Sequence, residues 1–187
     1  GNKEVMPIGQ APLPDSTVTM AEILKEVGYA TGAFGKWGLG YPESEGMPSR
    51  QGFDEFFGYL CQRRAHFYYP EFLFHDRQGQ QLQRVVLEGN KVDDSARKNF
   101  LQPDSGPPIE KGAYSQDAIT ERALSFIDQY SEEPFFLYFP SPLPHSSMTV
   151  PEQAMAPYLD EEGNSIFDEE PFTSNHFTDQ AMPKATY

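Results

Sequence analysis

A lysine in a glycine-rich loop is the first candidate for chemistry in this sequence. Residues 29–34 are typical of a short buried strand, and residues 35–40 read Gly-Lys-Trp-Gly-Leu-Gly. Glycines permit a tight turn and close approach of a ligand to the backbone, while the tryptophan can anchor the loop in a core. Loops at the carboxyl ends of strands line the ligand crevice of open α/β sheets, so we expect Lys36 to meet an anion there. An ordinary surface lysine in a turn fits these local features equally well.

A second apolar run leads to a histidine. Residues 135–139 read Phe-Phe-Leu-Tyr-Phe, which is typical of a central parallel strand covered on both faces. The proline-rich segment 140–144 then follows and would hold His145 at the sheet edge where Lys36 emerges. We therefore expect Lys36 and His145 to lie close together, within reach of one small anion.

Further candidates lie in residues 62–70. Here Arg63, Arg64 and His66 stand among aromatic residues without a clear periodicity. This composition is typical of an ordered loop over a binding site, and it fits a packed structural loop equally well. On the first reading, the two arginines and the histidine bind substrate.

Two helix–strand units must position these loops. Thr19 begins a capping box and Gly28 is suited to a left-handed cap, which predicts a helix over residues 19–27. Residues 115–130 carry an apolar stripe at helical spacing. Because each helix leads directly into an apolar strand, the order favours an α/β fold with a parallel sheet and helices on its faces.

The residues between the two units are expected to be peripheral. Residues 53–60 place Phe and Leu at i, i+3, i+4 and i+7, which predicts a short helix. Residues 72–88 predict a hairpin with its turn at 76–79. With the polar, proline-containing stretch 89–113, they form a hairpin and loop insertion over about 70–113.

Composition limits the classes of function. The 187 residues are enough for one domain, and the formal net charge of −14 disfavours nucleic acid and membrane surfaces as partners. No apolar stretch is long enough to span a bilayer, and residues 1–20 lack the order of a signal peptide. Cys61 is the only cysteine, and the acidic runs 160–162 and 168–170 lack calcium-loop spacing, so we predict no metal ligand.

The motifs together resemble the type I, formylglycine-dependent sulfatases (arylsulfatases) of the alkaline-phosphatase superfamily. They are Gly-Tyr-Ala-Thr-Gly-x-Phe-Gly-Lys-Trp at 28–37, Gln-Gly-Phe-Asp-Glu-Phe-Phe-Gly at 51–58, and Pro-Phe-Phe-Leu-Tyr followed by Pro144-His145. The resemblance implies part of an alkaline-phosphatase-like mixed or parallel sheet flanked by helices, and hydrolysis of an aryl or carbohydrate sulfate ester. It also implies that Lys36 contacts the sulfate and that His145 binds sulfate or acts as an acid near the leaving oxygen.

The sequence departs from the family pattern at three points. Gly38 stands where many members have a histidine, for which His66 is a possible substitute. The family nucleophile is a cysteine in a Cys-x-Pro-Ser-Arg type motif, whereas Cys61 precedes Gln-Arg-Arg. Counterparts of the calcium-binding residues are missing as well. The resemblance thus implies that residues 1–187 are the central portion of a catalytic domain, inactive alone, whose parent uses calcium and formylglycine.

Other functions and properties follow from the same resemblance. A phosphodiesterase or phosphonate hydrolase of the same superfamily is one alternative, and a non-catalytic binding or structural fragment is another. The implied partner is a sulfated small molecule or glycan, and the implied location is periplasmic, secreted or, in a eukaryote, lysosomal. We also expect open sheet edges beside the strands near 29–34 and 134–139, through which copies of the chain could associate.

Overall fold

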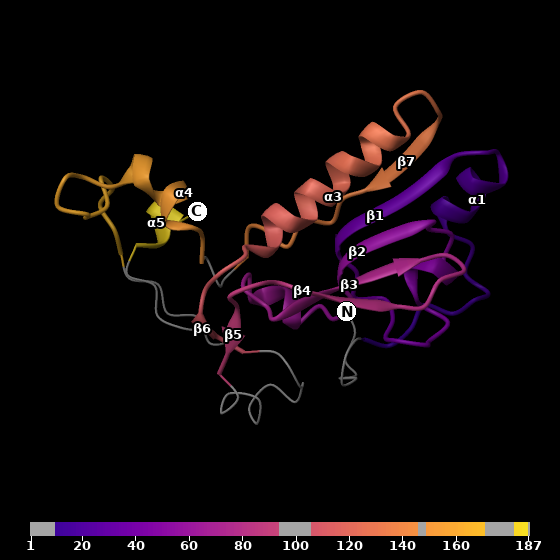
Figure 1. Cartoon of the computed structure of the whole chain (residues 1–187), viewed down its shortest axis with the longest axis horizontal. Coiled ribbons are helices and arrows are strands. Elements are labelled where there is room, and N and C mark those ends of the chain that lie inside the picture. Colours follow the sequence, from indigo (N-terminus) through magenta and orange to yellow (C-terminus); the bar gives the residue numbers. More distant parts are fainter. Residues whose placement is uncertain (1–9, 94–105, 146–148, 171–181, 187) are drawn as a thin grey trace.

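A five-stranded mixed sheet forms the centre of the computed structural model, which describes residues 10–93, 106–145, 149–170 and 182–186 (Figure 1). Its strand order is β4-β3-β2-β1-β7. The strands are β1 (Ala30–Lys36), β2 (Glu55–Tyr59), β3 (Phe72–Arg77), β4 (Gln83–Val86) and β7 (Phe135–Tyr138).

The strand β1 lies between two parallel neighbours. It pairs with β2 from Gly32 opposite Glu55 to Lys36 opposite Tyr59. On its other side it pairs with β7, where Ala30 lies opposite Phe135. The prediction that the strands near 29–34 and 134–139 share one parallel sheet is therefore confirmed.

Apolar side chains alternate between the two faces of this sheet. Because successive residues of a strand point to opposite sides, adjacent phenylalanines such as Phe56 and Phe57 enter different cores. One core contains Ala21, Ala33, Trp37, Met47, Phe53, Phe56, Leu60, Phe72 and Phe74. The other contains Phe34, Phe57, Tyr59, Ala65, Leu73, Leu87, Ile119, Ala123 and Phe126.

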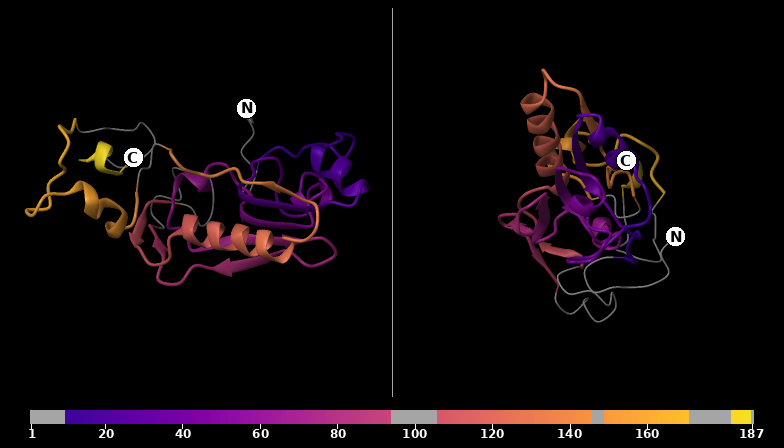
Figure 2. Two further views of the ribbon diagram at one scale, coloured as in Figure 1. Left: turned by 90° about the horizontal axis from the view of Figure 1, so that it is seen from above. Right: turned by 90° about the vertical axis from the view of Figure 1, so that its right-hand side faces the viewer.

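The two predicted helices cover opposite faces of the sheet (Figure 2). The helix α1 (Met20–Glu26) begins with the predicted capping box, since Thr19 and Glu22 each accept a hydrogen bond from the other's backbone N–H. The helix α3 (Ser115–Gln129) packs Phe126 against Phe34, with ring centroids 5.4 Å apart. Both helix predictions are confirmed to within one residue at each end.

The helix predicted over residues 53–60 is wrong, because β2 occupies most of this segment. Its strand is buried on both faces, so apolar residues do not alternate with polar ones, and their spacing coincides with that of a helix. The hairpin over 72–88 is confirmed as β3 and β4, which form one edge of the central sheet. Its first strand pairs with β2 and extends the central sheet.

The position of β7 differs from the expected central one. Within the described residues, β7 is the last strand of the sheet, and its side chains are half-buried or exposed. The strand β1 is paired on both sides, so the open edge expected beside it is also wrong. Association of copies through the outer edge of β7 stays a prediction.

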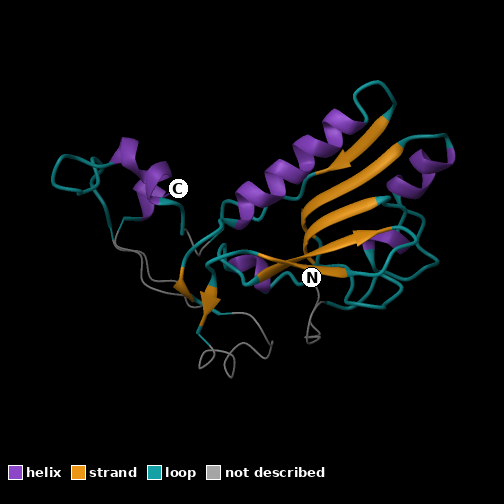
Figure 3. Cartoon of the chain, in the orientation of Figure 1, coloured by secondary structure: helices purple, strands orange, loops and turns teal. Residues whose placement is uncertain are grey.

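Smaller elements complete the described chain (Figure 3). The predicted excursion over 89–113 contains the two-stranded sheet of β5 (Lys91–Val92) and β6 (Pro108–Glu110), and its residues 94–105 lie outside the described part. The short helices are η1 (Pro48–Arg50), η2 (Arg64–His66), α4 (Glu152–Met155), η4 (Ala156–Tyr158) and α5 (Pro183–Thr186). None of the described helices combines the length and apolar character needed to cross a membrane.

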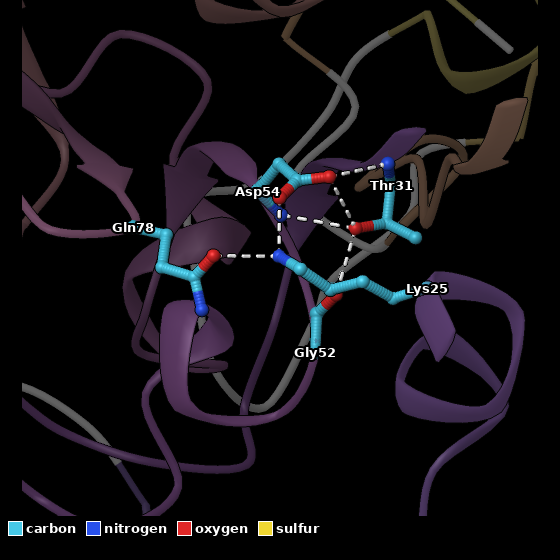
Figure 4. Close-up of polar contacts among 5 residues, drawn as sticks. All are labelled: Lys25, Thr31, Gly52, Asp54 and Gln78. Atoms are coloured by element: carbon cyan, nitrogen blue, oxygen red, sulfur yellow. Dashed lines mark hydrogen bonds and ion pairs between the residues drawn. The ribbon is translucent and has the colours of Figure 1, made fainter. Parts of the chain in front are cut away.

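A polar cluster joins α1, β1 and the start of β2 (Figure 4). The Asp54 carboxylate accepts hydrogen bonds from the Lys25 ammonium, from the Thr31 backbone N–H at 2.9 Å and from the Thr31 hydroxyl at 3.0 Å. The Thr31 hydroxyl lies 2.7 Å from the Gly52 carbonyl oxygen, and Lys25 also donates to Gln78 at 2.7 Å. The cluster fixes the amino ends of two parallel strands.

We expect Thr31→Val to lower the free energy of unfolding by about 1–3 kcal/mol, because the variant leaves buried partners of the hydroxyl without a hydrogen bond. The matched control is Thr120→Val on α3, whose hydroxyl is partly exposed and bonds only Gln116 within the described residues. Urea unfolding followed by circular dichroism measures both variants. Equal losses in the two would contradict a special role for Thr31.

We expect the cluster and its neighbour Glu55 to make stability fall in acid. Burial alone raises the pKa of Asp54, but hydrogen bonds from Lys25 and Thr31 outweigh it and hold the pKa below 3.8. Burial likewise raises the pKa of Glu55, but His75 and Arg77 lower it below 4.5. A lowered carboxyl pKa stabilises the fold above the unfolded-state value, and this contribution is lost as the pH falls through the folded-state value.

The measurement is the urea midpoint as a function of pH from 7 to 2, for the protein and for Asp54→Asn. The variant should be less stable at pH 7 and should lose less stability on acidification. Parallel curves for the two proteins would show that Asp54 does not contribute to the acid transition.

Candidate functional site

Three loops meet at the carboxyl edge of the parallel strands. They follow β1, β2 and β7. Residues predicted to act on substrate are Lys36, the last residue of β1, and His66 and His145 in the loops after β2 and β7. Backbone hydrogen bonds join the loops. The Lys36 N–H donates to the Pro140 carbonyl at 2.8 Å, and the Gly38 N–H donates to the Leu60 carbonyl at 3.0 Å.

The loop after β1 is held by its tryptophan. Trp37 is 8% exposed, and its indole N–H donates to the Gly46 carbonyl at 2.7 Å. Its ring meets Phe53 edge-on at 5.6 Å between centroids, and its backbone N–H donates to Tyr59 at 2.9 Å. The anchoring role predicted for Trp37 is confirmed. Lys36 is thereby held half-buried at the end of β1, where its ammonium can meet a ligand at the edge.

Gly38, which stands where the resemblance implies a histidine, changes the backbone as well as the side chain at this position. Gly38 has a φ of +75°, a conformation that residues with a side chain rarely adopt. A Cβ atom there would also lie 3.4 Å from Cβ of Gln62. A histidine at this position would therefore be strained by its backbone conformation, whereas the contact with Gln62 is at ordinary van der Waals distance.

His66 and His145 are in direct contact. Their rings are stacked, with centroids 4.1 Å apart and an angle of 19° between the planes. His66 ends η2 in the loop after β2, whereas His145 lies in the loop after β7. The structure thus brings together two of the predicted site residues from distant parts of the chain.

Two tyrosines that the sequence reasoning did not select support this pair. The Tyr68 hydroxyl donates to the His145 carbonyl at 3.3 Å, and burial raises the pKa of Tyr68 to about 12, so the donor proton is retained. The Tyr59 hydroxyl bonds the Phe67 carbonyl at 2.9 Å and Ser115 at 2.7 Å. The aromatic residues 67–69, which directly follow His66 in the sequence, could have indicated that Tyr68 lies near the histidine.

The two predicted arginines lie in different surroundings. Arg64 is 3% exposed, donates to the Phe72 carbonyl at 3.2 Å and places its guanidinium carbon 3.9 Å from the centre of the Phe72 ring. These contacts favour a structural role for Arg64 over the expected contact with substrate. Arg63 is exposed at the start of η2, so its charge faces the solvent near the histidine pair.

Cys61 does not present a reactive group at the surface. It is fully buried, and its sulfur lies 3.9 Å from the side-chain nitrogen of Gln10. Across the described ranges, no group of three or more His, Cys, Asp or Glu side chains is placed to hold a metal ion. The described residues therefore bring the imidazoles of His66 and His145 into contact, and a shared anion site with Lys36 stays a prediction.

Comparison with known proteins identifies the family. The family model described as Sulfatase matches residues 2–182. The chain is 31% identical over 140 residues to arylsulfatase J of Mus musculus, a match that covers 74% of the chain and 21% of the relative. It is 32% identical over 148 residues to an arylsulfatase of Hemicentrotus pulcherrimus, covering 76% of the chain and 24% of the relative. The chain thus spans about a quarter or less of these relatives.

Solved structures share the fold. A crystal structure of Ps i-CgsB matches with a TM-score of 0.52 and 23% identity, over 80% of this chain and 32% of that one. The PsFucS1 sulfatase from Pseudoalteromonas sp. matches with a TM-score of 0.50 and 19% identity, over 73% of this chain and 30% of that one. At these identities the likeness concerns the fold alone. Because the family model covers nearly the whole sequence, the chain belongs to the sulfatase family.

Proposed function

We propose that the enzyme containing this chain hydrolyses a sulfate ester carried by a small molecule or a glycan. The observation that carries the proposal is the contact between His66 and His145, on loops that backbone hydrogen bonds join to the end of β1, where Lys36 lies, in a chain of the sulfatase family. The enzyme acts in the periplasm, outside the cell or, in a eukaryote, in the lysosome.

Lys36 supplies fixed positive charge to the sulfate group. As the ester bond to sulfur breaks, negative charge grows on the sulfate and leaving oxygens, and a cation already in place stabilises that charge without reorganisation. The loop gives Lys36 this preorganisation through the buried Trp37 and its backbone bond to Tyr59. Arg63, exposed nearby, adds long-range attraction for an anion.

The histidine pair suits proton transfer. The two stacked imidazoles, with ring centroids 4.1 Å apart, carry ring nitrogens that can donate or accept a proton. In this proposal His145 binds the sulfate or acts as the acid for the leaving oxygen, with His66 stacked beside it. The Tyr68 hydroxyl donates to the His145 carbonyl and thereby holds the backbone of the loop that carries this histidine.

The implied calcium ion and formylglycine do not fit the residues described here. The described side chains form no cluster of metal ligands, and Cys61 is buried and has the wrong neighbours. We therefore derive no step through either group and propose that other residues of the enzyme supply both.

We expect Lys36→Ala, made in the complete enzyme, to lower kcat/KM for an aryl sulfate by about 100-fold or more, since one preorganised charge is lost. Its free energy of unfolding should change by less than about 0.5 kcal/mol. The matched variant Lys25→Ala should show the reverse, with a loss of about 1 kcal/mol of stability and unchanged kcat/KM. Losses of activity and stability that run in parallel for Lys36→Ala would favour a structural role.

We expect the 187-residue chain alone to hydrolyse no aryl sulfate above a catalyst-free control. Calcium should not raise its melting temperature, although a ligand of the folded state at a hundredfold excess over Kd would add about 2.7 kcal/mol of stability. A calcium titration followed by thermal unfolding and turnover tests both points, with an active sulfatase as the positive control. A calcium-dependent rise in melting temperature, or turnover, would contradict the proposal that other residues supply the metal site and the nucleophile.

A further inference from the structure

A pocket of about 460 Å³ opens beside the amino end of α3, outside the site described above. One wall comes from residue 69 and the segment 111–117, and the other comes from residues 150–153 at the start of α4. Six of its lining residues carry hydrogen-bonding groups: Tyr69, Lys111, Tyr114, Asp117, Glu152 and Gln153.

Hydrogen bonds hold the first wall of the pocket in place. The Asn90 side-chain amide donates to the carbonyls of Pro70 and Ala113, each at 2.8 Å, and its oxygen accepts from the Gly112 N–H at 2.7 Å. The Ser115 N–H donates to the Tyr68 carbonyl at 3.0 Å. These bonds fix the segment before α3 against the loop that carries Tyr69.

The lining favours hydrogen bonding over stacking. Tyr69 is only 4% exposed, and the Lys111 ammonium lies 5.7 Å from its ring centre. The Tyr69 ring therefore lines the pocket but leaves no exposed face on which a sugar could stack. By contrast, Lys111, Asp117 and Glu152 are exposed and can each bond a hydroxyl group. The Tyr114 hydroxyl is buried and has no hydrogen-bond partner among the described residues. Burial raises the pKa of Tyr114, so its hydroxyl keeps its proton.

The pocket is close to the histidine pair along the chain. Tyr69 follows His66 by three residues, which places their α carbons at most about 11 Å apart. Tyr68, between them, bonds the His145 carbonyl. The other wall begins at Val150, five residues after His145 and thus within about 18 Å of it.

We propose that this pocket binds an unsulfated sugar unit of a glycan whose neighbouring unit presents the sulfate to Lys36 and the histidine pair. This inference rests on the proposed function and narrows its substrate to a glycan. Asp117 and Glu152 outweigh the single positive charge of Lys111, so the pocket repels a sulfate group and accepts neutral hydroxyl groups.

The test is calorimetric titration of the protein with unsulfated tetrasaccharides of glucose, galactose, mannose, xylose and N-acetylglucosamine. At least one should bind, and Asp117→Asn and Glu152→Gln should each weaken that binding about tenfold, as expected for the loss of a charged hydrogen bond. The matched control is Asp128→Asn, which changes an exposed aspartate toward the opposite end of α3. This variant should bind the tetrasaccharide as tightly as the unmodified protein does.

Three results would overturn the proposal: no binding of any tetrasaccharide, binding that Asp117→Asn and Glu152→Gln leave unchanged, or occupation of the pocket by calcium chloride alone with no effect of sugars. Turnover of a small aryl sulfate by the complete enzyme is measured separately, and the control Asp128→Asn should leave its kcat/KM unchanged. If sugar binding is found and aryl sulfate turnover is not, the proposed reaction fails while the sugar site stands.

Discussion

The candidate site depends on how closely three backbone segments approach one another at the end of β1. A Cβ atom added at Gly58 would lie 2.0 Å from the carbonyl oxygen of Gly35, and one added at Gly35 would lie 2.2 Å from that of Pro140. The two glycines also have φ values of +153° and +135°. Any side chain at these positions would push β1 away from β2 or from the loop after β7. The pair therefore allows the three candidate loops to begin side by side.

The two ends of the parallel strands serve different purposes. At the amino ends, Asp54 and Glu55 find cationic partners within the chain, and these contacts fix the strands to α1 and to β3. At the carboxyl ends, the fixing contacts are largely backbone hydrogen bonds and the buried Trp37. Because the fold there does not rest on the Lys36 ammonium, that group can be used for a ligand. The motif residues 28–37 and 51–58 contribute to both ends.

The sequence predicts the local elements and misses arrangements that depend on distant residues. The capping box at Thr19 and the stripe over 115–130 are encoded within a few residues, and both helices are confirmed. The strand β2 was missed because burial on both faces removes the alternation that identifies a strand. The sequence left two readings of Arg64 open, because the rings that cover it belong to β3, which the sequence does not place beside it. The contact between His66 and His145 was not predicted, although both residues were selected.

The net charge of the chain bears on how a sulfated substrate could be oriented. With a formal charge of −14, the surface as a whole repels a sulfate, so approach is favoured only where cations offset this field locally. In the proposed function, the positive charges of Lys36 and Arg63 provide such a region. Asp117 and Glu152 lie beyond it in the pocket beside α3. A glycan bound across both regions is therefore driven to one orientation, because reversing it would place the sulfate against two carboxylates.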